Sequence, residues 1–247
     1  MTKHDSATRP QQALKIYNLL LESYKSENGI HTKDCLDIGC GTGEIGKILA
    51  SRFQSVVGIE VDLHRIQIDE NGDNFQKNFY FTQADGAHLP FENDSFDFII
   101  CAQVYEHTED QYGLVSEIQR VLKEDGVCFF SGPNKFTIME EHYFLPFLSW
   151  LPTRISDFYV RFFHRNSSYD IHPLSYHALQ KLLRNFAIED KTLQILQNPE
   201  RYGMVNRFAI LGLIQYMPLF LVKPILFLIP NFNFILRKNV HLSQKRN

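Results

Sequence analysis

Residues 36–46 read LDIGCGTGEIG, and this short stretch decides the fold. It joins an apolar run at residues 35–38 to a helical pattern at residues 45–53. Glycines permit a tight turn and let a ligand approach the backbone closely. The spacing of Gly41, Gly43 and Gly46 matches the GxGxxG pattern of dinucleotide sites, which is a weak signal on its own. We therefore expect a strand, a ligand-binding turn and a helix in this order.

Strand and helix patterns alternate along the rest of the chain. Further strands are predicted at residues 55–60, 79–83, 96–101, 127–131, 188–196 and 232–236, and further helices at residues 10–27, 62–70, 112–123 and 175–186. Strands separated by helix-length segments imply right-handed crossovers and a mostly parallel sheet. In such a sheet the ligand lies beyond the carboxyl ends of the strands, so residues at strand ends are the first candidates for function.

Size and composition fit one globular domain. The chain has 247 residues, of which 44% are hydrophobic, and this is enough for one substantial core. Its four cysteines form no CxxC pair, so we expect reduced core residues and neither disulfides nor a zinc site. The polar N-terminus has no signal-peptide pattern, which predicts a cytoplasmic protein.

Three acidic residues lie at or near predicted strand ends. Asp37 precedes the first glycine of the turn by two residues; its carboxylate would repel a pyrophosphate but suits the ammonium group of an amino-acid ligand. Glu60 ends the second strand, 19 positions after Gly41, where an acidic residue can accept hydrogen bonds from both ribose hydroxyls. Asp85 follows the third strand and is either an acceptor for an adenine amino group or an ordinary turn residue.

Taken together, these segments resemble the class I S-adenosylmethionine-dependent methyltransferases over residues 33–135. The resemblance is carried by LDIGCGTGEIG at residues 36–46, VVGIE at 56–60, ADGAHLPFENDSFDFII at 84–100 and VLKEDGVCFFSGPN at 121–134. It implies a Rossmann-like α/β fold with a doubly wound, mostly parallel seven-stranded sheet. It also implies S-adenosylmethionine as cofactor.

The resemblance assigns parts of the cofactor to particular residues. Asp37, Gly39, Gly41 and Gly43 are expected to hold the methionine part, Glu60 the ribose, Asp85 and Gly86 the adenine side, and Gln103 to lie near the sulfonium. The predicted cofactor-binding set is completed by their neighbours Cys40, Val61 and Ala87.

Residues 103–107 resemble the strand-end stretch of small-molecule O-methyltransferases, including the ubiquinone-biosynthesis type. In that type an acidic residue three places before the Glu-His pair helps to bind a metal, but this chain has Gln103 there, so no metal is predicted. His107, with Glu106 beside it, is a candidate general base for an acceptor hydroxyl. A histidine that only orients or packs a loop is an equal alternative, since methyl transfer needs mainly in-line approach of the acceptor.

Two segments interrupt the family pattern. Residues 133–174, called the lid segment here, are rich in aromatics and prolines and are predicted to cover the acceptor site. The predicted acceptor-side residues are Tyr105, Glu141, His142 and Tyr143; the alternative is a packed lid without direct contacts. The remaining parts of the single domain are expected at residues 1–32 (N-terminal helix), 33–132 (cofactor-binding core), 175–200 (helix and sixth strand), 201–230 (apolar helical insertion) and 231–247 (last strand and basic tail).

The C-terminal part of the chain differs in charge from the rest. Residues 1–150 hold 12 Lys or Arg and 23 Asp or Glu, a net charge of −11, whereas residues 151–247 hold 13 and 5, a net charge of +8. Residues 208–236 are almost wholly apolar and contain three prolines, which would break a helix. We expect attachment to an anionic membrane surface through residues 201–246. An apolar pocket wall or dimer interface, and a true membrane span, are the alternatives.

These observations predict methyl transfer from S-adenosylmethionine to a small-molecule acceptor, or to a lipid- or saccharide-linked one, most readily at oxygen. The protein is expected in the cytoplasm or on the inner face of a membrane. A NAD-dependent oxidoreductase and a catalytically idle cofactor-binding scaffold are the alternatives. A nucleic-acid partner is not expected, because the first 150 residues are acidic and no basic patch is interleaved with aromatics.

Overall fold

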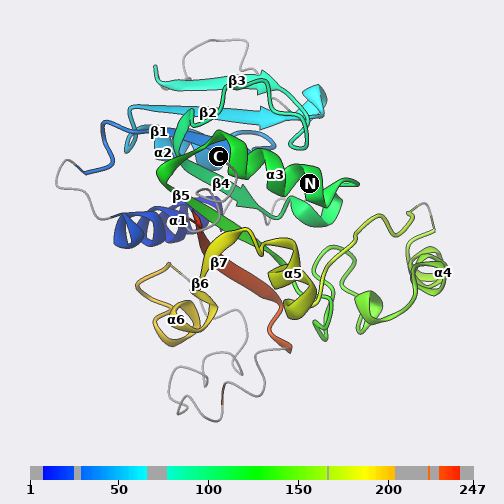
Figure 1. Ribbon diagram of the computed structural model, residues 1–247. Helices are drawn as coiled ribbons and strands as arrows, with labels where there is room; N and C mark the ends of the chain where they lie inside the picture. Colours follow the sequence, from blue (N-terminus) through cyan, green and yellow to red (C-terminus); the bar gives the residue numbers. More distant parts are fainter. Residues whose placement is uncertain are drawn as a thin grey trace.

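A computed structural model describes residues 8–24, 29–65, 77–165, 167–203, 222 and 228–239. The strands form one seven-stranded sheet in the order β3-β2-β1-β4-β5-β7-β6 (Figure 1). Their bounds are β1 Asp34–Ile38, β2 Ser55–Glu60, β3 Phe79–Gln83, β4 Phe96–Ala102, β5 Leu122–Pro133, β6 Phe186–Asp190 and β7 Asn231–Lys238. The helices are α1 Arg9–Ser23, α2 Glu44–Ala50, α3 Gln111–Val121, α4 Thr153–Phe163, α5 Tyr176–Leu182 and α6 Thr192–Gln197, with single 3₁₀ turns η2 Leu63–Arg65, η3 Tyr105–His107 and η4 Leu148–Trp150.

The order of the strands predicts a ligand-binding crevice at the end of β1. Strands β1 to β5 pair in parallel, and β7 enters antiparallel between β5 and β6. From β1 the chain continues outward to β2 and β3, then returns to β4 on the other side of β1. At such a reversal the loops diverge to opposite faces of the sheet and leave a crevice beyond the strand ends, where ligands of this kind of fold bind.

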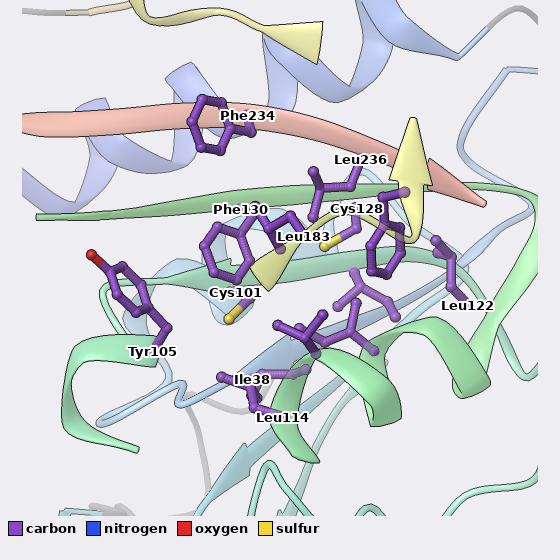
Figure 2. Packing of buried hydrophobic residues seen from close by; sticks show 14 of the residues in the cluster. Ile38, Cys101, Tyr105, Leu114, Leu122, Cys128, Phe130, Leu183, Phe234 and Leu236 are labelled. Carbon is purple, nitrogen blue, oxygen red and sulfur yellow. The ribbon is translucent and has the colours of Figure 1, made fainter. Parts of the chain in front are cut away.

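Helices cover both faces of the sheet, so its central strands are buried on both sides. Helices α1, α2 and α6 pack on one face, and α3 and α5 pack on the other (Figure 1). Successive residues of β4 therefore point to different cores. Phe98 and Ile100 join a first cluster, on the face covered by α1, α2 and α6, and Ile99 and Cys101 join a second cluster, on the face covered by α3 and α5. Figure 2 shows part of this second cluster, where side chains of α3 lie against those of the sheet. The family pattern of a mostly parallel seven-stranded α/β sheet is confirmed.

The lid segment has a small core of its own. It runs from the end of β5 to the residues before α5 and contains η4 and α4, which lies apart from the sheet (Figure 1). Leu145, Leu148 and Val160 pack with Tyr169 and Ile171 in a cluster separate from the two sheet cores. The segment is thus a packed unit beside the carboxyl ends of the strands.

Some predicted boundaries were wrong. The helix predicted to reach residue 123 ends at Val121, because Leu122 is extended (φ −70°, ψ 134°) and pairs with Phe96. The strand predicted to reach residue 196 ends at Asp190, and residues 192–197 form α6. Leu193 and Leu196 are three residues apart, so they also fit a helix, and the sequence did not separate the two patterns. The first helix ends at Ser23 and not at residue 27.

Other predictions fall mainly outside the described residues. They concern the helix at residues 62–70, of which only the turn at Leu63–Arg65 is described, and the apolar insertion, of which only residues 201–203, 222 and 228–230 are described. Across the described ranges, none of the helices combines the length and the hydropathy that a membrane crossing requires. The interpretation of residues 201–246 as a membrane-binding region stays a prediction.

A glycine on α2 allows this helix to approach the sheet. A Cβ added at Gly46 would lie 2.3 Å from Cε2 of Phe79 on β3. Alanine is favoured over glycine in a helix by about 1 kcal/mol, but overpacking a core costs about 1–3 kcal/mol. We expect Gly46→Ala to lower the free energy of unfolding, measured by urea denaturation, by about 1 kcal/mol. If the contact with Phe79 is the cause, Gly46→Ala should cost less free energy of unfolding in a Phe79→Leu background than in the wild type. Strictly additive effects of the two substitutions would contradict this explanation.

Candidate functional site

The glycine turn is closed by a carboxylate from the neighbouring strand. Glu60, at the end of β2 and only 5% exposed, accepts hydrogen bonds from the amides of Gly41 (2.9 Å), Val61 (3.0 Å) and Asp62 (3.2 Å). Gly41 and Gly43 have φ angles of +57° and +76°, which favour glycine. A Cβ added at Gly41 would meet nothing within 4 Å, so its backbone faces open space. This part of the turn is accessible to a ligand.

Asp37 is a buried carboxylate beside the same turn. It is 4% exposed, and its Oδ2 has no hydrogen-bond partner among the described residues. Burial raises its pKa to about 7; the guanidinium of Arg9 acts against this, and the carboxylate of Glu60 adds to it. A buried acceptor of this kind is costly when unpaired and is well suited to a cationic donor. The residues on this side of the crevice therefore fit the ammonium group of an amino-acid ligand.

The loop after β3 holds further residues of the predicted cofactor-binding set. Asp85 accepts a hydrogen bond from the amide of Ala87 (2.9 Å) and lies 3.3 Å from Nδ1 of His88, so in this structure it shapes its own loop. Gly86 lies against Leu114 of α3. Val61 is 65% exposed at the end of β2. An adenine contact by Asp85 stays a prediction.

Cys40 and Gly39 complete the turn without an evident chemical role. The amide of Cys40 donates to the carbonyl of Ile59 (2.9 Å), and burial raises the pKa of its thiol, which keeps the sulfur protonated. Gly39 has φ +65°, and a Cβ there would lie 2.6 Å from Val104. Both residues hold the turn against its neighbours.

Gln103 links the end of β4 to the lid segment. It has a positive φ of 60°, which is unusual for a residue with a side chain. Its Nε2 donates to Oδ1 of Asn231 (3.0 Å), and Nδ2 of Asn231 donates to the carboxylate of Glu141 (3.0 Å to each oxygen). Nearby, Lys15 donates to Asn233 (3.1 Å), and burial lowers the pKa of Lys15 to about 8, opposed by the charge of Glu141. The side-chain amide of Gln103 is thus held in place between the sheet and the lid segment.

Acidic and histidine side chains gather between η3 and the lid segment. Glu106 is fully buried, neither of its carboxylate oxygens has a hydrogen-bond partner among the described residues, and burial raises its pKa to about 7. The ring of His107 lies edge-on to that of His142, with centroids 5.2 Å apart. Burial lowers the pKa of His107, whereas the hydrogen bond from Nδ1 of His142 to Glu140 (2.8 Å) raises the pKa of His142 against the effect of burial.

Two predicted acceptor-side residues are placed differently from the expectation. Tyr105 is fully buried; its hydroxyl donates to the carbonyl of Pro133 (2.5 Å) and accepts from the amide of Leu174 (3.2 Å). Its ring stacks on Phe130 in the core shown in Figure 2. Direct contact between Tyr105 and an acceptor was therefore a wrong prediction. Tyr143 is half-buried and donates to the carbonyl of Ser168 (2.6 Å) within the lid segment.

The structure brings the predicted residues together in two groups. Asp37, Gly41 and Glu60 meet at the switch point of the sheet, and Glu106, His107 and His142 meet between η3 and the lid. Sequence reasoning missed two residues, Asn231 and Glu140. The stretch around residues 140–143 is acidic and aromatic and could have suggested Glu140, but only the antiparallel position of β7 explains Asn231.

Comparison with known proteins agrees with this architecture. Residues 36–130 match a family model described as a methyltransferase domain. The chain is 32% identical over 119 residues to a ubiquinone biosynthesis O-methyltransferase of Actinobacillus pleuropneumoniae serotype 5b, covering 44% of this chain and 49% of that protein. It is 32% identical over 97 residues to a demethylmenaquinone methyltransferase of Lactobacillus johnsonii, covering 37% and 40%. This chain therefore spans about half the length of the curated relatives that it matches.

Solved structures share the fold over most of the chain. The YcgJ protein of Bacillus subtilis has a TM-score of 0.56 at 18% identity and covers 92% of this chain and 98% of its own. The PH0226 protein of Pyrococcus horikoshii has a TM-score of 0.58 at 16% identity and covers 97% and 92%. At these identities the likeness concerns the fold alone.

The buried carboxylate of Asp37 predicts a pH-dependent stability. In the unfolded chain an aspartate loses its proton near pH 3.9, whereas folded Asp37 keeps it up to about pH 7. The folded state binds more protons than the unfolded state in this window. Ionisation of Asp37 therefore lowers the free energy of unfolding progressively from about pH 4 to about pH 7, and this cost stays constant above about pH 7. We expect Asp37→Asn, without ligand, to raise the melting temperature more at pH 8 than at pH 4.5.

Thermal denaturation from pH 4.5 to 8 measures this difference, with the exposed Asp125→Asn as the matched control. The control should shift the melting temperature equally at all pH values. An Asp37→Asn difference that does not change with pH would refute the raised pKa of the carboxyl.

Proposed function

We propose that this chain, which belongs to the class I S-adenosylmethionine-dependent methyltransferase family, transfers the methyl group of S-adenosylmethionine to a hydroxyl oxygen of a small or lipid-linked acceptor. The observation that carries the proposal is the buried oxygen of Asp37, which has no hydrogen-bond partner in the described part of the chain and lies beside an open glycine turn at the switch point of the sheet. A cofactor with an ammonium group, a ribose and an adenine matches the carboxylates at the ends of β1, β2 and β3.

Each residue of the cofactor side has a definite task in this proposal. Asp37 accepts hydrogen bonds from the ammonium group in its ionised form, so binding is favoured as pH rises toward the apparent pKa of about 7. Glu60 keeps unused acceptor capacity after its three backbone bonds and accepts from the ribose hydroxyls. Val61 offers an exposed apolar side chain, and Asp85 and Gly86 lie on the adenine side.

The bound cofactor supplies an electrophilic methyl group on a positively charged sulfur. The chain then has to hold the acceptor oxygen in line with the sulfur–carbon bond and exclude water. The oxygen forms a bond to the methyl carbon as the sulfur–carbon bond breaks, and the hydroxyl proton passes to a base. His107 is our candidate for that base, since its lowered pKa leaves the imidazole neutral and able to accept a proton near pH 7.

The relatives bear on the acceptor. One is named a ubiquinone biosynthesis O-methyltransferase and another a demethylmenaquinone methyltransferase, and both names denote methyl transfer. A quinone-type acceptor with a lipid tail would fit a lid segment with exposed aromatic side chains, and also the predicted membrane-surface attachment through residues 201–246. We infer a cytoplasmic-side enzyme acting on such an acceptor.

A NAD-dependent oxidoreductase is the second candidate, and the position of Asp37 disfavours it. A buried carboxylate next to the turn would repel the pyrophosphate that such a turn otherwise binds. Binding of NAD by the wild-type protein, with no binding of S-adenosylmethionine, would favour this alternative.

Calorimetry with S-adenosylhomocysteine, combined with turnover on a panel of catechols and polyprenylated quinols, tests the proposal. We expect micromolar binding to the wild type, at least tenfold weaker binding to Glu60→Gln, and release of S-adenosylhomocysteine from S-adenosylmethionine with one acceptor class. His107→Ala should keep the binding affinity but lose at least tenfold in turnover.

The exposed His177→Ala is the matched control and should change neither quantity. A well-folded wild type that binds neither S-adenosylhomocysteine nor S-adenosylmethionine would refute the proposed function. Unchanged turnover in His107→Ala would remove only the proposed base.

A further inference from the structure

Three polar side chains from distant parts of the chain are hydrogen-bonded in series at the carboxyl edge of the sheet. Both carboxylate oxygens of Glu141 accept from Nδ2 of Asn231 (3.0 Å each), and Oδ1 of Asn231 accepts from Nε2 of Gln103 (3.0 Å). Glu141 belongs to the lid segment, Asn231 begins β7 and Gln103 follows β4. These three groups, called the amide relay here, connect the lid segment to the end of β4.

The amide relay fixes which end of each amide faces which neighbour. An ionised carboxylate can only accept hydrogen bonds, so the nitrogen of Asn231 faces Glu141 and its oxygen faces Gln103. The nitrogen of Gln103 then faces Asn231, which leaves Oε1 of Gln103 outside this bond. Among the residues that the structure describes, no group donates a hydrogen bond to this oxygen. Its orientation is therefore set from the lid segment, and its acceptor capacity is unused.

Gln103 lies beside the glycine turn. Strand β4 pairs with β1, and the pairing of Ile38 with Cys101 places Gln103 two residues beyond the last paired position, at the level of the turn. The next residue, Val104, touches the turn itself, because a Cβ added at Gly39 would lie 2.6 Å from its side chain. The oxygen that the amide relay orients thus belongs to the side of the sheet edge where the cofactor is proposed to bind.

The backbone of Gln103 is strained. Its φ of 60° lies in the left-handed region, which costs free energy for a residue with a Cβ, whereas glycine would adopt it freely. The amide nitrogen donates to the carbonyl of Ser131 (2.9 Å), so the strained conformation is anchored to β5. Strain of this kind is typical of functional sites, and here it indicates a task for the side chain.

We propose that Glu141 and Asn231 are positioning residues that hold Oε1 of Gln103 toward the positively charged sulfur of the cofactor. This inference rests on the proposed function and deepens it. The partial negative charge of the oxygen attracts the sulfonium of S-adenosylmethionine, but it has no such attraction to the neutral sulfur of S-adenosylhomocysteine. The amide relay therefore favours the substrate form of the cofactor over the product form. Because Glu141 belongs to the lid segment, this preference depends on the contact between the lid segment and β7.

Calorimetry with S-adenosylmethionine and S-adenosylhomocysteine on the full chain, without acceptor, tests the proposal. The measured quantity is the ratio of the two affinities. We expect Gln103→Leu and Asn231→Leu each to weaken S-adenosylmethionine binding about tenfold more than S-adenosylhomocysteine binding. In a Gln103→Leu background, Asn231→Leu should leave the ratio unchanged, because the group that it orients is already absent. A residue needed only for folding would not change this ratio.

Two variants of Glu141 separate orientation from charge. Glu141→Gln removes the charge but keeps an oxygen that can accept from Asn231, so it should retain most of the wild-type ratio. Glu141→Ala should lower the ratio as Asn231→Leu does. An equal loss in both variants would contradict the amide relay, since only the charge would then matter. The exposed Glu92→Ala, located before the start of β4, is the matched control and should keep the wild-type ratio.

Circular dichroism verifies that each variant is folded. Glu141 is exposed, so its variants provide the test even where Asn231→Leu fails to fold. An unchanged ratio in folded Asn231→Leu or Glu141→Ala would overturn the proposal, as would equal weakening of both ligands. Either result, with both ligands bound by the wild type, leaves the proposed function intact. A wild type that binds neither ligand refutes the proposed function and this inference together.

Discussion

The hydrogen bond from the amide of Gly41 to the carboxylate of Glu60 is the interaction on which the cofactor side depends. It ties the glycine turn after β1 to the end of β2, and the parallel pairing of these strands sets its geometry. Near this bond lies a second buried carboxylate, Asp37, whose pKa is raised by burial and further by the charge of Glu60. Among the causes of the shift at Asp37, the charge of Arg9 acts in the opposite direction. The folded protein therefore stores an electrostatic cost that a cationic ligand would relieve.

A similar cost occurs on the acceptor side. Glu106 is buried after β4, and its carboxylate has no hydrogen-bond partner among the residues that the structure describes, whereas the oxygens of the buried Glu140 are bonded to His142 and Tyr143. Two buried carboxylates thus lie near the pair formed by His107 and His142. Natural cores rarely tolerate this arrangement without a compensating charge. On the cofactor side, the ammonium group of the proposed cofactor would supply such a charge.

The sheet could be predicted from the sequence because its central strands are buried on both faces and therefore appear as continuous apolar runs. The bounds of β2 and β3 match the prediction, whereas α6 was mistaken for the end of a strand, because Leu193 and Ile195 alternate as in a strand while Leu193 and Leu196 have helical spacing. Side-chain positions in the site were harder to predict. Tyr105 looks like an acceptor contact in sequence, but its hydroxyl bonds to Pro133, 28 residues away. The partner of Gln103 is likewise 128 residues away in sequence, on a strand whose antiparallel position no local pattern reveals.

A crystal structure of the protein with S-adenosylhomocysteine tests the central claim most directly. The account predicts the ligand in the crevice at the ends of β1 and β2, with its ammonium group within hydrogen-bond distance of Oδ2 of Asp37 and its ribose hydroxyls on Glu60. A ligand bound elsewhere, or one whose ammonium group leaves Asp37 unpartnered, would contradict it.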